Sequence, residues 1–134
     1  MPKPLSHFRI VDLSCVLAGP FATQLLADLG AEVQKLEPPE GDPTRGWGPP
    51  FDSDSGESAY FRSANRGKVS RSVDLHTDEG RETLFDLLKD ADVLVENFLA
   101  DSADRLGLGW KRRRRWATSG GQYNRYWEPP RRSA

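Results

Sequence analysis

The sequence predicts an α/β fold in which a parallel β-sheet is flanked by helices, as in the Rossmann-like folds. Residues 9–37 place one helical segment between two short apolar runs, all within 29 residues. Residues 69–95 repeat that order of apolar run, helical segment and apolar run. Parallel strands need a crossover connection, usually a helix, so this alternation favours a parallel sheet.

The first strand and turn are expected at residues 10–20. Residues 10–13 form a β-branched and aliphatic run of the length of a buried strand, which should end near Ser14. Ala-Gly-Pro at residues 18–20 then predicts a turn with the helix beginning at about Pro20, since proline suits the first helical position. The free N–H groups of residues 21–23 should face the carboxyl ends of the strands, where anionic ligands bind.

The first helix is expected to carry an apolar stripe. Phe21, Leu25 and Leu29 recur at four-residue spacing, which predicts that this face packs on the sheet as core. Gly30 supplies the stop signal, and a second strand follows over residues 33–36. Together these elements predict a right-handed crossover.

The next segment, residues 37–54, is rich in proline, glycine and acidic residues, which predicts an irregular surface loop. Trp47 and Phe51 are expected to pin this loop to the protein. Val69, Arg71, Val73 and Leu75 then alternate in a strand-like period, which predicts a third strand.

A second helix is expected over residues 78–89, with Thr77 as its N-cap and acidic residues in its first turn. A buried strand should follow at residues 93–95, which places Asn97 and Phe98 at its carboxyl end. A short helix is expected over residues 101–106.

Composition changes sharply after residue 110. Residues 1–110 contain 11 Lys or Arg and 19 Asp or Glu, whereas residues 111–134 contain 8 and 1. The second segment has no Val, Ile, Leu, Met or Phe, so it cannot bury enough apolar surface to offset the entropy of ordering. We expect residues 111–134 to form a disordered basic tail.

Three interpretations of this Arg- and Trp-rich tail stay open. Its basic side chains and interleaved aromatic rings could bind nucleic acid. The basic cluster could instead be a targeting signal. Neither function explains why an ordered scaffold stops before the tail. The third interpretation, which we favour, is an aberrant reading frame or misjoined exon, because an Arg- and Trp-rich segment without aliphatic residues is typical of GC-rich codons read out of frame. Nucleic-acid binding is therefore not expected.

Other function classes find little support. A single cysteine, Cys15, excludes an internal disulfide, and it is expected to be a small buried hydrophobe rather than a nucleophile. His7 and His76 are too isolated for a metal site. The absence of an apolar run of membrane-spanning length and of a leader predicts a cytoplasmic protein with no membrane contact.

Five segments together resemble a known family. They are residues 9–37, 42–51, 65–68, 72–75 and 95–98, of which the last three read Asn-Arg-Gly-Lys, Ser-Val-Asp-Leu and Val-Glu-Asn-Phe. Their order and spacing are similar to the N-terminal part of the class III coenzyme A transferases, the CaiB/BaiF or formyl-CoA transferase-like family. The resemblance covers residues 5–110. It implies an incomplete N-terminal domain over residues 1–110, followed by the tail.

The resemblance also implies a ligand and the residues around it. The ligand is coenzyme A or acyl-CoA as a substrate, with a carboxylic acid as the second substrate and no tightly bound cofactor. The implied contacts are Val16, Leu17 and Ala18 for pantetheine and phosphate, Val73, Asp74, Leu75 and His76 beside adenine, Asn97, Phe98 and Leu99 on the opposite wall, and Arg105 for phosphate.

Several positions depart from the family pattern. Leu17 stands where several relatives have a glutamine that helps to hold the acyl intermediate, and Pro38 stands where they have a basic residue. Ala100 and Asp101 replace the usual Pro-Gly pair, which puts a carboxylate near the expected phosphate charge. Because a carboxylate disfavours a neighbouring anion, we expect weakened CoA binding.

Some charged residues have a simpler interpretation than ligand binding. Arg45, Arg66 and Lys68 are equally well explained as solvated loop charges. Asp12 and Asp28 are expected to be structural.

The implied activity is transfer of CoA between an acyl-CoA and a carboxylic acid through an aspartyl anhydride. The motifs are closer to transferases that use succinate or other dicarboxylates than to the α-methylacyl-CoA racemases, which remain an alternative. No counterpart of the nucleophilic aspartate is found after Trp110, so the chain alone is expected to be inactive. A non-catalytic CoA-binding or partner-binding remnant is the other alternative. Family members form interlocked homodimers, and the part needed for that is not found either.

Overall fold

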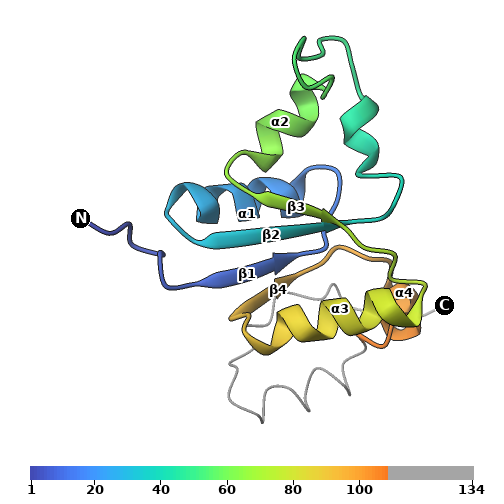
Figure 1. Ribbon diagram of the computed structural model, residues 1–134. Helices are drawn as coiled ribbons and strands as arrows, with labels where there is room; N and C mark the ends of the chain where they lie inside the picture. The colour runs from blue at the N-terminus through green and yellow to red at the C-terminus, as the bar shows by residue number, and fades with distance from the viewer. Residues whose placement is uncertain (109–134) are drawn as a thin grey trace, which may run out of the picture.

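The computed structural model describes residues 1–108, which form a four-stranded parallel sheet with helices on both faces (Figure 1). The predicted α/β fold is confirmed. The strands are β1 (Arg9–Asp12), β2 (Glu32–Glu37), β3 (Val69–Ser72) and β4 (Val93–Val95). The helices are α1 (Ala18–Asp28), the 3₁₀ turn η1 (Pro43–Gly46), α2 (Ala59–Asn65), α3 (Asp78–Lys89) and α4 (Ala100–Arg105). The predictions for the tail, residues 111–134, lie outside the described residues.

The strand order is β3-β2-β1-β4, and all neighbouring strands are parallel. The chain therefore first winds outward from β1 through β2 to β3, and then returns to place β4 on the other side of β1. Ile10 of β1 is in register with Val33 of β2 and with Val93 of β4. This reversal makes the carboxyl ends of β1 and β4 a topological switch point, where open α/β sheets bind ligands.

Two apolar clusters fill the space on opposite faces of the sheet. Val11 and Leu36 pack with Leu84 and Leu88 of α3 on one face. Ile10 and Val33 pack against the α1 side on the other face, together with Ala27 and Ala31. Successive strand residues point to opposite faces, so this division follows from the alternation along β1 and β2.

Several predicted elements are confirmed. Helix α3 has the predicted bounds, and the Thr77 hydroxyl accepts a hydrogen bond from the Gly80 N–H at 3.0 Å. Strand β4 also has its predicted bounds, but its three residues are half-buried and not buried as expected. Gly30 ends the first crossover helix with a φ of 108°, a conformation that glycine adopts without strain. Among residues 1–108, no helix has both the length and the apolar character of a membrane span.

The beginning of α1 differs from the prediction. The helix starts at Ala18 instead of Pro20, and the Phe21 N–H donates to the Leu17 carbonyl at 2.8 Å. This N–H is therefore used within the helix and does not face a ligand. The helix can include Pro20 in its first turn, because N–H groups of the first turn have no partner within the helix and proline lacks only this group.

The prediction that the α1 stripe is core was wrong. Phe21, Leu25 and Leu29 are 47–48% exposed. The buried side of α1 instead contains Thr23 and Ala27, together with Pro20 and Gln24. Small residues allow the helix to lie close to the sheet, and the two buried polar side chains have hydrogen-bond partners from other segments. The hydrogen bonds of Thr23 and Gln24 therefore determine which side of α1 is buried. The spacing of apolar residues does not indicate such bonds.

The surface-loop prediction for residues 37–54 was partly wrong. Asp42 and Thr44 are buried, while Trp47 and Phe51 are about half exposed and do not anchor the loop in a core. The sequence reading also missed α2, whose N-cap Ser58 accepts a hydrogen bond from the Phe61 N–H at 3.0 Å.

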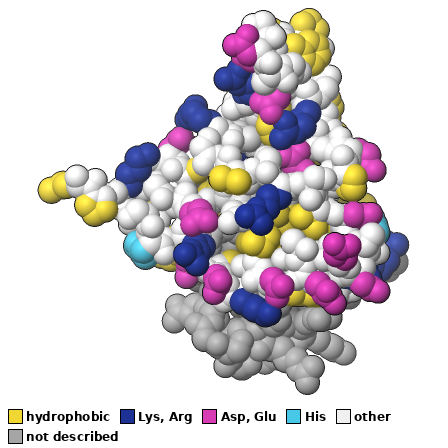
Figure 2. Space-filling view, in the orientation of Figure 1, with side chains coloured by type: hydrophobic (Ala, Val, Ile, Leu, Met, Phe, Trp, Pro, Cys, Tyr) yellow, Lys and Arg dark blue, Asp and Glu magenta, His cyan; other side chains and the backbone are white. Residues whose placement is uncertain are grey.

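The outer side of α3 is acidic. Figure 2 shows a row of acidic side chains in the lower half of this view, in the region where Figure 1 draws α3. The exposed acidic residues of this helix are Asp78, Glu79, Glu82 and Asp86. An anionic ligand is therefore not favoured over this surface, which directs attention to the edge of the sheet.

Candidate functional site

The candidate site lies at the carboxyl ends of β1 and β4. The segment after β1 contains Ser14, Cys15 and Val16, and the segment after β4 contains Asn97 and Phe98. Because β1 and β4 are parallel neighbours, both segments leave the sheet at the same edge. The structure thus joins two parts of the chain that are 82 residues apart.

Asn97 connects these two segments directly. Its Oδ1 accepts a hydrogen bond from the Cys15 N–H at 3.0 Å, and its Nδ2 donates to the Cys15 carbonyl at 2.8 Å. One side chain therefore satisfies both backbone polar groups of Cys15. An amide is suited to this because it carries one acceptor and one donor group.

The preceding residue is held in a similar way. The Ser14 N–H donates to Oδ1 of Asp12 at 2.9 Å, and the Ser14 carbonyl accepts from Nζ of Lys35 at 2.8 Å. All four backbone polar groups of Ser14 and Cys15 are thus bonded to side chains, which come from β1, from β2 and from the segment after β4. This turn is rigidly defined before any ligand arrives.

Val16 follows this turn with a φ of 70°. It is the one non-glycine residue with positive φ among residues 1–108. For a β-branched residue this backbone conformation is a genuine outlier, and it persists only where the surroundings impose it. Such outliers cluster at ligand sites, and this one lies at the switch point of the sheet.

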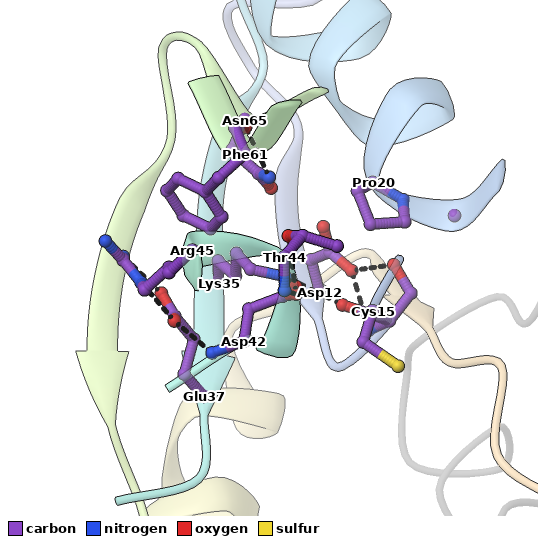
Figure 3. Close-up of polar contacts among 12 residues, drawn as sticks. Asp12, Cys15, Pro20, Lys35, Glu37, Asp42, Thr44, Arg45, Phe61 and Asn65 are labelled. Carbon is purple, nitrogen blue, oxygen red and sulfur yellow. Dashed lines mark hydrogen bonds and ion pairs between the residues drawn. The ribbon is translucent and has the colours of Figure 1, made fainter. Parts of the chain in front are cut away.

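Two buried ion pairs support the turn, and Figure 3 draws one of them, Lys35 with Asp42, close to Asp12. Nζ of Lys35 lies 2.9 Å from Oδ2 of Asp42, and Nζ of Lys68 lies 3.0 Å from Oδ2 of Asp12. Lys68 also donates to the Pro20 carbonyl at 2.7 Å. These pairs connect the end of β1 to the start of α1 and to the loop after β2, so charged side chains form the interior of this part of the protein.

The pairs alter the acid–base properties of their members. Burial alone raises the pKa of Asp42, but hydrogen bonds from Thr44 and the pairing with Lys35 outweigh it and hold the pKa below its usual value. Burial lowers the pKa of Lys68, and Asp12 only partly offsets that effect. Burial and the nearby Asp42 raise the pKa of the Cys15 thiol, which disfavours the thiolate that a nucleophile needs.

Arg45 and Lys68 are not the solvated charges that one interpretation of the sequence gave. Nε and Nη2 of Arg45 donate to the two carboxylate oxygens of Glu37, both at 2.7 Å, and the guanidinium lies 3.8 Å from the centroid of the Phe61 ring. These bonds outweigh the effect of burial and lower the pKa of Glu37 to about 2. Arg66, in contrast, is largely exposed and pairs with Asp28.

Most of the other predicted contact residues follow the carboxyl end of a strand: residues 16–18 follow β1, residues 73–76 follow β3 and residues 97–99 follow β4, whereas Arg105 lies in α4. Val16 is half-buried, while Leu17 and Ala18 are exposed. Val73 is buried, and Leu75 and Phe98 pack against the same apolar cluster. The remaining residues are Asp74, which is half-buried, and His76, Asn97, Leu99 and Arg105, which are exposed.

Hydrogen bonds link only some of these residues to the turn. The bonds of Asn97 bring it next to the turn that contains Val16. The His76 carbonyl accepts a hydrogen bond from Arg81 of α3 at 3.1 Å, and Arg105 donates to the Asp101 carbonyl of its own helix, α4, at 3.3 Å.

Sequence reading missed the role of Lys35 and Asp42, and it gave Asp12 only a general structural role. One signal was available. Lys35 lies in a short predicted strand between the apolar Val33 and Leu36, and a lysine that is buried there needs a paired acid. The sequence does not identify that acid, because Asp42 reaches Lys35 only after the loop folds back.

Known proteins resemble this chain in sequence and in fold. Residues 5–117 match the family model described as CoA-transferase family III. The match extends beyond Trp110, where the resemblance was expected to stop.

The chain is 48% identical over 113 residues to a succinate–glutarate CoA-transferase of Agrobacterium fabrum. The aligned region covers 81% of this chain and 28% of the relative. It is 50% identical over 110 residues to a succinyl-CoA:mesaconate CoA-transferase of Haloarcula hispanica, covering 80% of this chain and 28% of the relative. The chain thus spans little more than a quarter of the length of these relatives.

A solved structure supports the same assignment. A CaiB/BaiF family protein from Brucella suis superimposes with a TM-score of 0.82 at 45% identity, covering 87% of this chain and 31% of that one. Because a family model matches most of the sequence and the fold agrees, the chain belongs to CoA-transferase family III.

Proposed function

We propose that residues 1–108 form the CoA-binding part of a transferase that moves CoA from succinyl-CoA, or another dicarboxylyl-CoA, to a carboxylic acid. The observation that carries this proposal is the turn at the β1–β4 switch point, where every backbone polar group of Ser14 and Cys15 is bonded and Val16 has a positive φ. Relatives named for succinyl-CoA and for glutarate or mesaconate support the choice of substrates.

The chemistry of the edge is compatible with the parts of CoA. Leu17, Ala18 and Leu99 are exposed there and would contact the pantetheine arm. The segment of residues 73–76 would border the adenine, and Arg105 would meet a phosphate. Asp101, one turn before Arg105 in α4, should weaken that phosphate contact because its carboxylate repels the same anion.

The reaction would proceed through covalent catalysis. An aspartate carboxylate attacks the thioester carbon, the new C–O bond forms, the C–S bond breaks, and CoA leaves as a thiolate, which leaves a mixed anhydride. The thiolate then attacks the aspartyl carbonyl of the anhydride, which releases the donor acid and forms an enzyme-bound CoA thioester. The acceptor carboxylate attacks this thioester to give a second anhydride and releases the thiolate, which takes the new acyl group and frees the aspartate. We find no counterpart of this aspartate in the 134 residues, so we propose that the polypeptide binds CoA without turning it over. Cytoplasmic location and homodimeric assembly remain predictions.

Calorimetric titration of the purified 134-residue polypeptide with CoA tests the binding proposal. We expect saturable heat that Arg105→Gln reduces. Arg62→Gln is the matched control, because Arg62 is also exposed but lies on α2 and pairs with Asp52. Absence of any heat with the folded wild-type chain would remove the proposal.

The lack of turnover needs a separate assay. Mixing the polypeptide with succinyl-CoA and glutarate should produce no glutaryl-CoA above the rate without protein. Detection of the product by mass spectrometry would show that a nucleophile is present after all.

A further inference from the structure

We infer that Asn97 is a positioning residue, whose side chain locks the Cys15 peptide groups and thereby fixes the backbone of Val16. The lock follows from the contacts of this chain alone. Its use in presenting Val16 to CoA rests on the proposed function.

The side chain of Asn97 extends the β1–β4 ladder beyond the end of β4. The last backbone bond of this ladder runs from the Leu13 N–H to the Val95 carbonyl at 2.8 Å. Two residues further along each chain, the Asn97 side chain takes the place of the strand: Oδ1 accepts from the Cys15 N–H, and Nδ2 donates to the Cys15 carbonyl. A side-chain amide has the same donor and acceptor groups as a peptide unit, so it can act as one more rung.

The Asn97 side chain binds the residue directly before Val16, whose backbone is strained. Ser14, on the β1 side of the turn, is held by Asp12 and Lys35. Cys15, which directly precedes the left-handed Val16, has its backbone bonds from Asn97. Without them the Cys15 carbonyl would have no hydrogen bond among the described contacts, and Lys35 would hold only the peptide unit between Ser14 and Cys15. The backbone at Val16 could then return to the more favourable negative φ.

This assignment differs from a contact on the wall of the site. A residue that only touches a ligand could be replaced without changing the free protein. A residue that holds the turn must change the protein in the absence of any ligand. The distinction can be measured without CoA, so failure of the lock and failure of the proposed function give different results.

Cys15 provides the reporter, because it is the single cysteine of the chain and is half-buried in the locked turn. The rate of its alkylation by iodoacetamide, a neutral reagent, measures how often the turn opens. We expect Asn97→Leu to raise this rate about tenfold or more, since leucine has a similar size and no hydrogen-bonding group. Asn97→Gln, which keeps both groups, should restore part of the protection.

Ser63→Leu is the matched control. It makes the same kind of polar-to-leucine change at an exposed position of α2 and should leave the rate unchanged. Equal rates in wild type and Asn97→Leu would overturn the inference.

Hydrogen exchange of the wild-type chain supplies a second test that needs no variant, so it remains decisive if Asn97→Leu fails to fold. The Cys15 amide should exchange slowly, like the amides of β1. Exchange at the rate of an unstructured amide would overturn the lock. A raised alkylation rate in Asn97→Leu, together with no CoA binding by the wild type, would retain the lock and remove only the proposed function.

Discussion

The ammonium group of Lys35 lies 2.9 Å from the carboxylate of Asp42, and each side chain is only 1% exposed. The same ammonium group donates to the Ser14 carbonyl. One buried cation therefore joins the middle of the sheet, the loop after β2 and the turn of the candidate site. The pair is expected to be expensive to break, because either partner alone would be a buried charge.

Replacing Lys35 by methionine should destabilise the protein by about 3–5 kcal/mol, since it leaves the Asp42 carboxylate buried without its partner. Urea unfolding followed by circular dichroism measures the loss. The double variant Lys35→Met/Asp42→Leu should recover most of it, because an apolar pair carries no desolvation penalty. A single variant that loses less than about 1 kcal/mol would contradict a strong dependence on the pair.

Acid should unfold the protein partly through Glu37. Its pKa in the folded protein is about 2, below the ordinary value of 4.5, because Arg45 binds the carboxylate. This contribution is complete above pH 4.5 and is lost as the pH falls from there toward 2. Between pH 5 and pH 3, the wild type should lose on the order of 2 kcal/mol more than Glu37→Gln in urea unfolding. Parallel pH profiles of the two proteins would show that Glu37 is not responsible.

The two leucine environments on opposite sides of the sheet should respond differently to truncation. Leu84→Ala removes a fully buried side chain of α3 and should cost about 2–5 kcal/mol. Leu25→Ala changes the half-exposed stripe of α1 and should cost less than about 1 kcal/mol. Thermal unfolding of both variants gives the comparison. Equal losses of stability would indicate that the stripe of Phe21, Leu25 and Leu29 is part of the core after all.

Glycine should be well tolerated at Val16. The left-handed backbone disfavours valine by about 1–3 kcal/mol, which offsets the entropy that glycine loses on folding. Val16→Gly should therefore leave the free energy of unfolding within about 1 kcal/mol of the wild type. Val73→Gly is the control, because Val73 is buried and has no positive φ; it should destabilise by at least about 2 kcal/mol.

The parts of the fold that sequence reading predicted well depend on local signals. Thr77 and the acidic residues after it fix the start of α3, because a cap satisfies the N–H groups of the same segment. Gly30 ends α1 for an equally local reason. The family motifs, in addition, predicted the carboxyl ends of β1 and β4, which Val16 and Asn97 follow, as the candidate site.

The parts that were missed depend on distant partners. Thr23 rather than Phe21 faces the sheet, because Asp12 of another element accepts its hydroxyl hydrogen bond at 2.5 Å. Lys35 is buried because Asp42 returns to it through a loop that no periodic pattern describes. Hydrophobic spacing carries no information on such pairs, so the polar interior under the turn could be found only from the structure.

The strand order has a consequence for synthesis and folding. Strand β1 lies between β2 and β4, so one of its edges stays unpaired until residues 93–95 have left the ribosome. During that interval the nascent chain exposes Ile10 and Val11 on an open edge, which can pair with other chains and aggregate. Chaperone dependence should therefore be highest for nascent chains that stop before β4, and it should fall once that strand has docked.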